Sequence, residues 1–395
     1  MEGKRVLRSI TLKNILSFGP EGQTLNFEPL NVLIGPNGSG KSNLIDILGF
    51  LRTIPRDIAS IFQQGKGIKD WLWKGTNVSE FFYVDSVWEY GETEFVRHEL
   101  GLGLRENKPC VFGELIYKPE NPGNEHGPAI FVFDWDKIHI GKAIFELEGS
   151  ENTNLPKNFR HDQSILAQRR DTDRFPEMAY LGDQYSRIVL YRNWHFGRDS
   201  HVRMLQLASL RGDFLSEDAT NLHQVLKRIF SVEGLKENLA EHLRTLSEDI
   251  QAVNLVDLRE FTELNITETG GKTISAFRIS DGVLRYLALL AVLCDPDPPP
   301  LICIEEPELG LHPDIIPTIA KLLIDASQRT QLIVTTHSAD LVSALWEFPE
   351  SVVVCERRES GTQLKRLDPV RLEKWLERYS LGELWLNGEI GGTRW

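Results

Sequence analysis

Residues 35–42 read Gly35-Pro36-Asn37-Gly38-Ser39-Gly40-Lys41-Ser42, which is the G-x-x-x-x-G-K-S spacing of a phosphate-binding loop. The apolar run 30–34 before it predicts a buried strand, and the run 43–48 after it predicts an apolar helix. A glycine-rich loop between a strand and a helix is the context in which this motif is specific. The order strand, loop and helix therefore predicts an α/β fold.

Each residue type in this loop has a chemical reason to be there. Glycines let backbone N–H groups close around phosphate oxygens, at a helix N-terminus that already favours anions. We expect Lys41 to reach the outer phosphates and the Ser42 hydroxyl to bind Mg²⁺. The alternative is a glycine-rich turn that binds no nucleotide, but a Lys-Ser pair after such a turn has no packing purpose.

The composition limits the class of protein. The 395 residues suffice for one large or two modest domains, and 41% apolar with 26% charged residues is typical of globular proteins. We expect no membrane span and no secretory signal. The four cysteines include no C-x-x-C pair, which disfavours a zinc site and a disulfide framework. This pattern is typical of a protein in the reducing cytoplasm. The net charge of −13 disfavours non-specific coating of nucleic acid, although a local basic groove stays open.

The pattern along the chain predicts a mixed central sheet, an antiparallel β layer and an inserted helical subdomain. Alternating strands and helices after residue 282 predict a parallel sheet covered on both faces. No internal repeat or long heptad run is present. We expect a strand at 255–267, a strand pair at 351–356 and 363–367, and a helix at 372–386. The expected division is a nucleotide-binding core from 1–55 and about 250–395, a β-rich part at 56–200, and a helical insertion at about 205–250.

Two carboxylates end the apolar run 301–304. A central strand delivers its last residues to the sheet edge where open α/β sheets bind ligands. We expect Glu305 near Mg²⁺, which prefers hard oxygen ligands, and Glu306 beside the attacking water, where a carboxylate accepts its proton. The alternative is a pair of solvated glutamates at a strand end, which the upstream phosphate-binding loop disfavours.

Two further segments carry candidate site residues. His337 follows another apolar strand and could donate a hydrogen bond to the terminal phosphate, although a lone histidine is more often structural. Ser280-Asp281-Gly282 opens an apolar helix, so its hydroxyl and amides can bind an anion. The same residues also read as an ordinary helix cap. They cannot join the site at 35–42 without a second molecule.

Together these residues resemble an ATP-binding-cassette (ABC) ATPase, in the branch that contains RecF, the structural-maintenance-of-chromosomes (SMC) proteins and the overcoming-lysogenization-defect nucleases. The resemblance covers residues 1–55 and roughly 250–345. It implies a P-loop ATPase head that hydrolyses ATP with Mg²⁺. It also implies a homodimer that sandwiches ATP, with higher oligomers left open. The implied motifs are Walker A (35–42), Walker B (301–306), the signature (280–282), the D-loop (306–313) and the switch histidine (His337).

The sequence departs from the family pattern at two positions. Glu305 stands where Walker B usually has Asp, and the extra methylene is expected to slow turnover. Asp281 replaces the first Gly of the usual Ser-Gly-Gly signature, although Ser-Asp-Gly is familiar in this branch. The Q-loop glutamine has two candidates, Gln163 and Gln168.

Three functions remain open at this stage. The first is an ATP-driven switch on DNA or on a DNA-acting partner, in repair or recombination. The second is a defence module that controls a separately encoded nuclease or toxin, since no appended nuclease (TOPRIM) domain is expected. The third is the nucleotide-binding subunit of a membrane transporter, which the Ser-Asp-Gly signature disfavours. Candidate DNA contacts, which also read as solvated surface charge, are Arg52 with Arg56, and Gln168-Arg169-Arg170 with Arg174.

Overall fold

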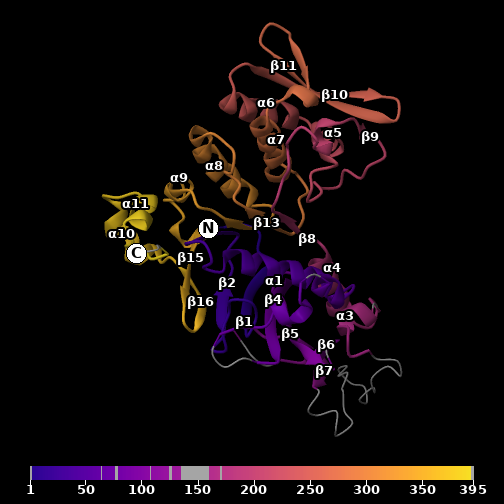
Figure 1. Ribbon diagram of the computed structural model, residues 1–395, viewed down its shortest axis with the longest axis vertical. Coiled ribbons are helices and arrows are strands. Elements are labelled where there is room, and N and C mark those ends of the chain that lie inside the picture. The colour runs from indigo at the N-terminus through magenta and orange to yellow at the C-terminus, as the bar shows by residue number, and fades with distance from the viewer. Residues whose placement is uncertain are drawn as a thin grey trace.

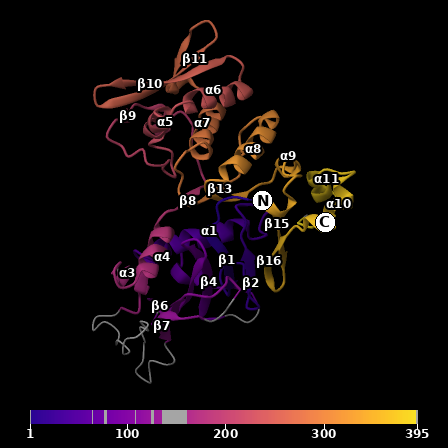
Figure 2. The same cartoon turned by 180° about the vertical axis from the view of Figure 1, so that it is seen from behind.

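The computed structural model of the chain describes residues 2–63, 65–75, 79–106, 108–123, 127–134, 160–169 and 171–392. Three β-sheets organise these residues. A central, mostly parallel sheet lies between two other sheets (Figure 1). An antiparallel sheet lies at one end of the molecule, and a smaller sheet with helices packed beside it lies at the other end. Figure 2 gives the same order from behind. Among the described residues, no helix has both the length and the apolar character that crossing a bilayer requires.

The central sheet has the strand order β16-β15-β3-β14-β13-β8. Its strands are parallel except at the β16 edge, which confirms the predicted parallel sheet. The strands are β3 (Leu30–Ile34), β8 (Ile188–Tyr191), β13 (Leu301–Glu305), β14 (Gln331–Thr335), β15 (Val352–Arg358) and β16 (Gly361–Arg366). Residues 188–191 were expected in the β-rich part, but they form the edge strand β8 of the central sheet. The sequence of so short an apolar run does not indicate which strand it pairs with.

Both faces of the central sheet are buried, and successive residues of β3 show it. Val32 and Ile34 pack into one hydrophobic core, whereas Leu33 between them packs into the other. The first core contains α7 (Asp281–Leu293) and α8 (Ile316–Ala326), and the second contains α1 (Lys41–Thr53). A strand buried on both sides is apolar almost throughout, and the one polar residue of β3, Asn31, is buried with its side chain hydrogen-bonded to the Glu28 and Leu332 carbonyl oxygens.

The antiparallel sheet confirms the predicted β layer and covers the α1 side of the molecule. Its strand order, which the sequence did not predict, is β2-β1-β4-β5-β6-β7. Along β4, Phe82, Val84 and Trp88 are buried at alternate positions and join the core that holds α1. The elements are β1 (Leu7–Lys13), β2 (Gln23–Asn26), β4 (Phe81–Tyr90), β5 (Glu94–Arg105), β6 (Lys108–Tyr117) and β7 (Ala129–Asp134), followed by α3 (Ile165–Gln168) and α4 (Pro176–Ser186).

The insert lobe, defined here as residues 206–275, carries the third sheet. It contains β9 (Gln206–Leu207), α5 (Leu222–Phe230), α6 (Leu235–Leu246), β10 (Ile250–Leu258), β11 (Phe261–Glu268) and β12 (Thr273–Ser275). The stretch 255–267 was predicted as one strand, and this was wrong, because β10 and β11 form a hairpin within it. Arg259 takes the left-handed conformation at this turn (φ 56°), so the turn lacks the glycine that would have signalled it.

The end of the chain differs from expectation in one element. Residues 372–386 were predicted as a single helix, but they contain the end of α10 (Pro369–Leu376) and all of α11 (Leu381–Leu386). Ser380 starts the second helix with a capping box to Glu383, and a capping box marks a new N-terminus. The predicted strand pair near 351–367 is confirmed as β15 and β16, preceded by the short helix α9 (Ala339–Ser343).

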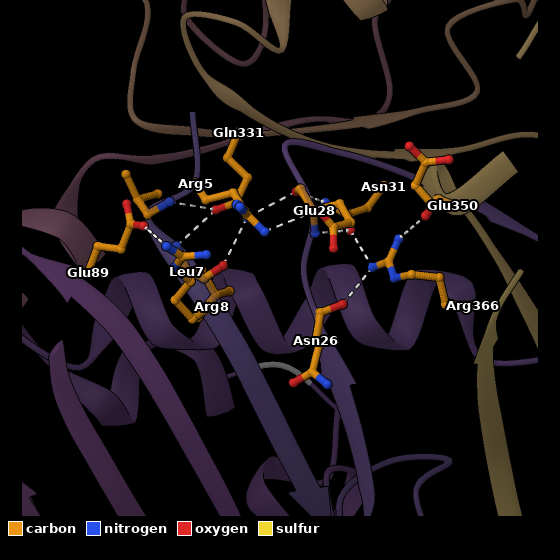
Figure 3. A network of polar contacts seen from close by, with 11 residues as sticks. Arg5, Leu7, Arg8, Asn26, Glu28, Asn31, Glu89, Gln331, Glu350 and Arg366 are labelled. Atoms are coloured by element: carbon orange, nitrogen blue, oxygen red, sulfur yellow. Dashed lines mark hydrogen bonds and ion pairs between the residues drawn. The ribbon is translucent and has the colours of Figure 1, made fainter. Parts of the chain in front are cut away.

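A buried polar network ties the antiparallel sheet to the central sheet at the amino ends of its strands (Figure 3). Gln331 at the start of β14 is fully buried, and its carbonyl oxygen accepts from the N–H groups of Val6 (3.2 Å) and Leu7 (2.9 Å). Its amide donates to the carbonyl oxygens of Leu7 (2.9 Å) and Glu28 (3.2 Å). Beside it, the Arg366 guanidinium donates to the Asn31 side chain at 2.6 Å. One side chain therefore satisfies backbone groups of two layers.

We expect Gln331→Leu to lower the free energy of unfolding by about 2–3 kcal/mol, because it leaves buried backbone donors and acceptors without partners. Gln328→Leu is the matched control, since Gln328 is exposed and its side chain donates only to the Glu2 carbonyl in the contacts described. Urea denaturation of both variants measures the difference. Equal losses of stability in the two variants would contradict the role given to Gln331.

Candidate nucleotide-binding site

The phosphate-binding loop at 35–42 requires its glycines for steric reasons. Gly35, Gly38 and Gly40 have φ values of 142°, 80° and 107°, which side-chain-bearing residues rarely adopt. A Cβ atom at Gly35 would lie 2.2 Å from the Cys355 carbonyl oxygen, and one at Gly40 would lie 2.3 Å from the Thr362 hydroxyl. The loop is therefore pressed against the β15–β16 hairpin, at distances that only a bare backbone tolerates.

Thr362 also holds the loop from the hairpin side. Its hydroxyl oxygen lies 2.9 Å from the Ser39 carbonyl oxygen and 2.7 Å from the Ser17 hydroxyl, and all three residues are buried. This role of Thr362 was not predicted from the sequence, because the residue lies more than three hundred positions from the loop. The strand pair that closes the chain thus forms one wall of the loop.

Lys41 directly follows the last glycine of the loop, and it is largely buried. Its ammonium group donates to the carbonyl oxygens of Gly35 (2.7 Å) and Pro36 (3.2 Å), so the side chain folds back over its own loop. Burial lowers the pKa of Lys41, and the nearby groups of Cys355, Glu306 and Glu305 oppose that shift. An anion in the loop would offer this amine stronger, charge-assisted partners than two carbonyls.

Glu305 ends β13 and fits a cation site. Its Oε1 atom is buried with no hydrogen-bond partner among the described residues, and the Arg192 Nε atom lies 3.7 Å away. Arg192 pairs more closely with Asp46 of α1, at 2.6 Å. Burial raises the pKa of Glu305, while the charge of Arg192 opposes the rise. A buried carboxylate oxygen without a partner is what a hard cation such as Mg²⁺ would satisfy.

Glu306 and His337 meet at the same sheet edge, although thirty residues separate them. Glu305 is paired with Thr335 in the parallel register of β13 and β14, so the residues after both strands emerge side by side. The His337 Nε2 atom lies 3.7 Å from the Glu306 carboxylate, and both side chains are partly exposed. Glu306 has a φ of 48°, and its N–H donates to the Thr335 carbonyl (2.9 Å). A strained, non-glycine backbone is a common feature of functional sites.

Glu308 positions the loop that carries His337, a role that the sequence did not reveal. Its Oε1 atom accepts from the Thr336 hydroxyl (2.5 Å) and from the His337 backbone N–H (3.1 Å). Its Oε2 atom is buried without a hydrogen-bond partner in the described part of the chain. The only hint in the sequence was its place in the D-loop-like run 306–313. The turn after β13 therefore fixes the turn after β14.

The Ser280-Asp281-Gly282 segment contacts other parts of the head. The Ser280 hydroxyl caps α7 by accepting from the Val283 N–H (3.3 Å), as the cap interpretation predicted. Asp281 accepts a hydrogen bond from Arg203. A Cβ atom at Gly282 would lie 3.4 Å from the Gly310 carbonyl oxygen, so the segment borders the D-loop-like turn. The structure brings Lys41, Glu305, Glu306 and His337 together and places residues 280–282 beside that turn.

The two Q-loop candidates have local roles. The Gln163 side chain donates to Asp57 (2.8 Å) and accepts from the Ile58 N–H (3.3 Å). The Gln168 amide donates to the carbonyl oxygens of Arg160 and Gln163. These bonds brace the turns around η1 (Ile58–Phe62) and α3, so neither side chain is directed at the phosphate-binding loop by the contacts found.

The candidate basic patches are only partly available to a ligand. Arg52 forms an ion pair with Glu217, and Arg169 lies over the ring of Phe175 at 4.9 Å. Arg56 and Arg174 are exposed. Arg170 lies outside the described residues.

Comparisons with known proteins agree with this geometry. The model of the family described as "AAA domain, putative AbiEii toxin, Type IV TA system" matches residues 30–96 and 130–343, more than half of the chain. An ATP/GTP phosphatase of Helicobacter pylori is 21% identical over 86% of this chain and 87% of its own length. The chromosome partition protein Smc of Mycobacterium tuberculosis is 40% identical over 18% of this chain, which is 6% of that protein.

Solved structures show the fold. An Smc head bound to the C-winged helix domain of ScpA covers 94% of this chain and 100% of its own, with a TM-score of 0.57 and 15% identity. The Smc head of Pyrococcus furiosus, bound to the C-terminal domain of ScpA, covers 94% and 98%, with a TM-score of 0.55 and 13% identity. The described chain therefore has the P-loop ATPase fold of SMC heads, as the sequence resemblance implied.

We expect Glu308→Ala to lower kcat for nucleotide hydrolysis about tenfold while leaving nucleotide affinity nearly unchanged, because the His337 loop loses its anchor but the phosphate-binding loop keeps its contacts. Glu308→Gln keeps the accepting oxygen and should retain most of the activity. Steady-state kinetics and a fluorescent-nucleotide titration separate the two effects. A matching loss in both variants would assign the effect to charge rather than to loop position.

Proposed function

The chain belongs to the family described as "AAA domain, putative AbiEii toxin, Type IV TA system" and is an ATPase of the ABC and SMC type; we propose that it is an ATP-dependent dimerisation switch that controls a separate effector. One observation carries the proposal. The signature segment borders its own D-loop-like turn, since a Cβ atom at Gly282 would lie 3.4 Å from the Gly310 carbonyl oxygen, and none of the hydrogen bonds found among the described residues joins residues 280–282 to the phosphate-binding loop. It therefore presents the second half of the nucleotide site to another copy of the chain.

Within one copy, the chain's own residues bind and orient the substrate. The loop amides at 35–42 hold the phosphates of ATP, and Lys41 moves from the Gly35 and Pro36 carbonyls to the outer phosphates. Ser42 and Glu305 would hold Mg²⁺, which supplies charge neutralisation at the phosphate oxygens. The Oε1 atom of Glu305, which is buried without a hydrogen bond among the described residues, supports this assignment.

Proton transfer is assigned to Glu306. A carboxylate at the end of β13 can accept the proton of the attacking water. His337, held 3.7 Å from that carboxylate, donates to the terminal phosphate, and Glu308 fixes the backbone that carries it. The bonding of Glu308 to both Thr336 and His337 supports a preformed arrangement in the free head.

Two copies would close face to face, so that the phosphates in one copy's loop meet Ser280 of the other. Two large apolar side chains flank the face that this closure would bury. Phe277, three residues before Ser280, is 54% exposed, and Leu309 in the D-loop-like turn is 55% exposed. Apolar side chains exposed beside a polar site are typical of a surface that is buried on association. ATP then holds the dimer together and hydrolysis releases it.

The family description, which names a toxin, favours a role in defence over a role in DNA repair. The negative net charge of the chain favours a protein effector over DNA as the partner. The net charge is −13, and Arg52 is already paired with Glu217. The effector would be a separately encoded nuclease or toxin whose activity follows the state of the dimer. The Smc relatives keep chromosome maintenance as the second candidate, because their matched segments share the same head.

The first test traps the switch. We expect Lys41→Ala to abolish ATP binding, and Glu306→Gln to bind ATP, to lose at least about 100-fold in hydrolysis and to accumulate as an ATP-bound dimer. Light scattering after size-exclusion chromatography, with ATP and with ADP, measures the dimer. Hydrolysis by Glu306→Gln at the wild-type rate would refute the base assignment, and a monomer with bound ATP would refute the switch.

The second test separates DNA from a protein effector. We expect the trapped Glu306→Gln dimer to show no more than weak, non-specific affinity for duplex DNA at about 0.15 M salt, because the chain's net charge of −13 repels the phosphate backbone. Fluorescence anisotropy over a salt series, with and without ATP, measures this affinity. Tight, ATP-dependent binding with a steep salt dependence would move the proposal from an effector to DNA.

A further inference from the structure

Arg203 is the most extensively bonded buried arginine in the contacts described, and the residues that it binds surround the signature segment. It ends the short helix η3 (His201–Arg203), and its side chain is only 4% exposed. Its Nε atom donates to the carbonyl oxygens of Phe196 (2.9 Å) and Gly197 (3.1 Å). Its remaining donors reach the carbonyl oxygens of Ala276 (3.0 Å), Phe277 (3.3 Å) and Ile279 (2.6 Å), and the carboxylate of Asp281.

This geometry needs a guanidinium. Five N–H donors in a rigid plane can bind carbonyls on several sides at once, whereas a lysine ammonium has three donors and no plane. The three carbonyls at 276–279 belong to the turn that leads directly into Ser280. Because these carbonyl oxygens point toward Arg203, the arginine fixes the backbone conformation that leads into Ser280.

Asp281 balances the buried charge. It is the residue that stands in place of the usual signature glycine, and its carboxylate is the anionic partner of Arg203. Its side chain is 68% exposed, so the pair spans from the interior of the head to the face that carries Ser280. A glycine at this position could not supply the charge that a buried guanidinium requires.

The same short helix connects to the insert lobe. The Val202 carbonyl lies 3.0 Å from one ring nitrogen of His223 in α5, and the other ring nitrogen lies 2.9 Å from the Thr262 carbonyl in β11. His223 is fully buried. A chain of close polar contacts therefore runs from the lobe sheet through His223 of α5 and η3 to the residues before Ser280.

We propose that Arg203 and Asp281 form a clamp that holds the signature segment in the conformation that receives the nucleotide of a second copy, and that couples this segment to the insert lobe. Both are positioning residues, because they act through the backbone of residues 276–282. The proposal rests on the ATP-dependent dimer proposed above. It adds that the signature of this chain works through a charge pair instead of through glycine flexibility.

The test places Arg203→Lys and Asp281→Asn separately in the Glu306→Gln background. We expect each variant to raise the dimer Kd in the presence of ATP by about tenfold or more, since each loses charge-assisted hydrogen bonds at the signature. ATP affinity of the dilute, monomeric head should stay within about twofold, because the phosphate-binding loop is untouched. Asp281 is largely exposed, so its variant reports on the clamp even if Arg203→Lys folds poorly.

Arg228→Lys in the same background is the matched control. Arg228 also lies in this half of the molecule and donates to the Gly212 carbonyl (2.7 Å) and to the carboxylate of Asp295, away from Ser280. It should lose stability without weakening the dimer. Equal weakening by Arg228→Lys, or normal dimers in both clamp variants, would overturn the proposal. A Glu306→Gln parent that stays monomeric with ATP would instead refute the dimer itself.

Discussion

The close packing of the phosphate-binding loop against the β15–β16 hairpin is the constraint on which the nucleotide site depends. No side chain fits at Gly35 or Gly40, because the Cys355 carbonyl and the Thr362 hydroxyl occupy that space. The hairpin can reach these positions only if β15 lies directly beside β3 in the central sheet, as it does. The last strands of the described chain are therefore part of the site, even though none of their residues carries a catalytic group.

The parallel register of the central sheet brings the other candidate site residues together. Parallel strands β3, β14 and β13 end at one edge, so Lys41, His337 and the two glutamates emerge next to one another from segments far apart in sequence. Glu308 holds the turns after β13 and β14 in place, because its carboxylate in the first turn accepts hydrogen bonds from Thr336 and His337 in the second. The Gln331 network at the opposite edge, with its bonds to β1, holds the antiparallel layer in place and leaves the ligand edge clear (Figure 3).

At each of the two departures from the family pattern, an arginine lies near the unusual carboxylate. Glu305 replaces an aspartate and lies near Arg192, and Asp281 replaces a glycine and is bound by Arg203. In each case an arginine from the segment 188–203 meets the additional or lengthened acidic side chain. That segment runs from the edge strand β8 into the helix that precedes the insert lobe, so it touches both halves of the proposed composite site. Neither departure can be judged from the motif alone, because its partner lies outside the motif.

The sequence by itself determined the features that depend on neighbouring residues. Glycines at 35, 38 and 40, the largely apolar strands at 30–34 and 301–304, and the cap at Ser280 are local requirements, and they predicted the fold and the position of the candidate site. Only the tertiary structure revealed Thr362, Glu308, Arg192 and Arg203, the edge position of β8 and the hairpin at Arg259. These depend on which distant segments touch, and a hydroxyl, carboxylate or guanidinium gains its role only from the carbonyl or charge that folding places opposite it.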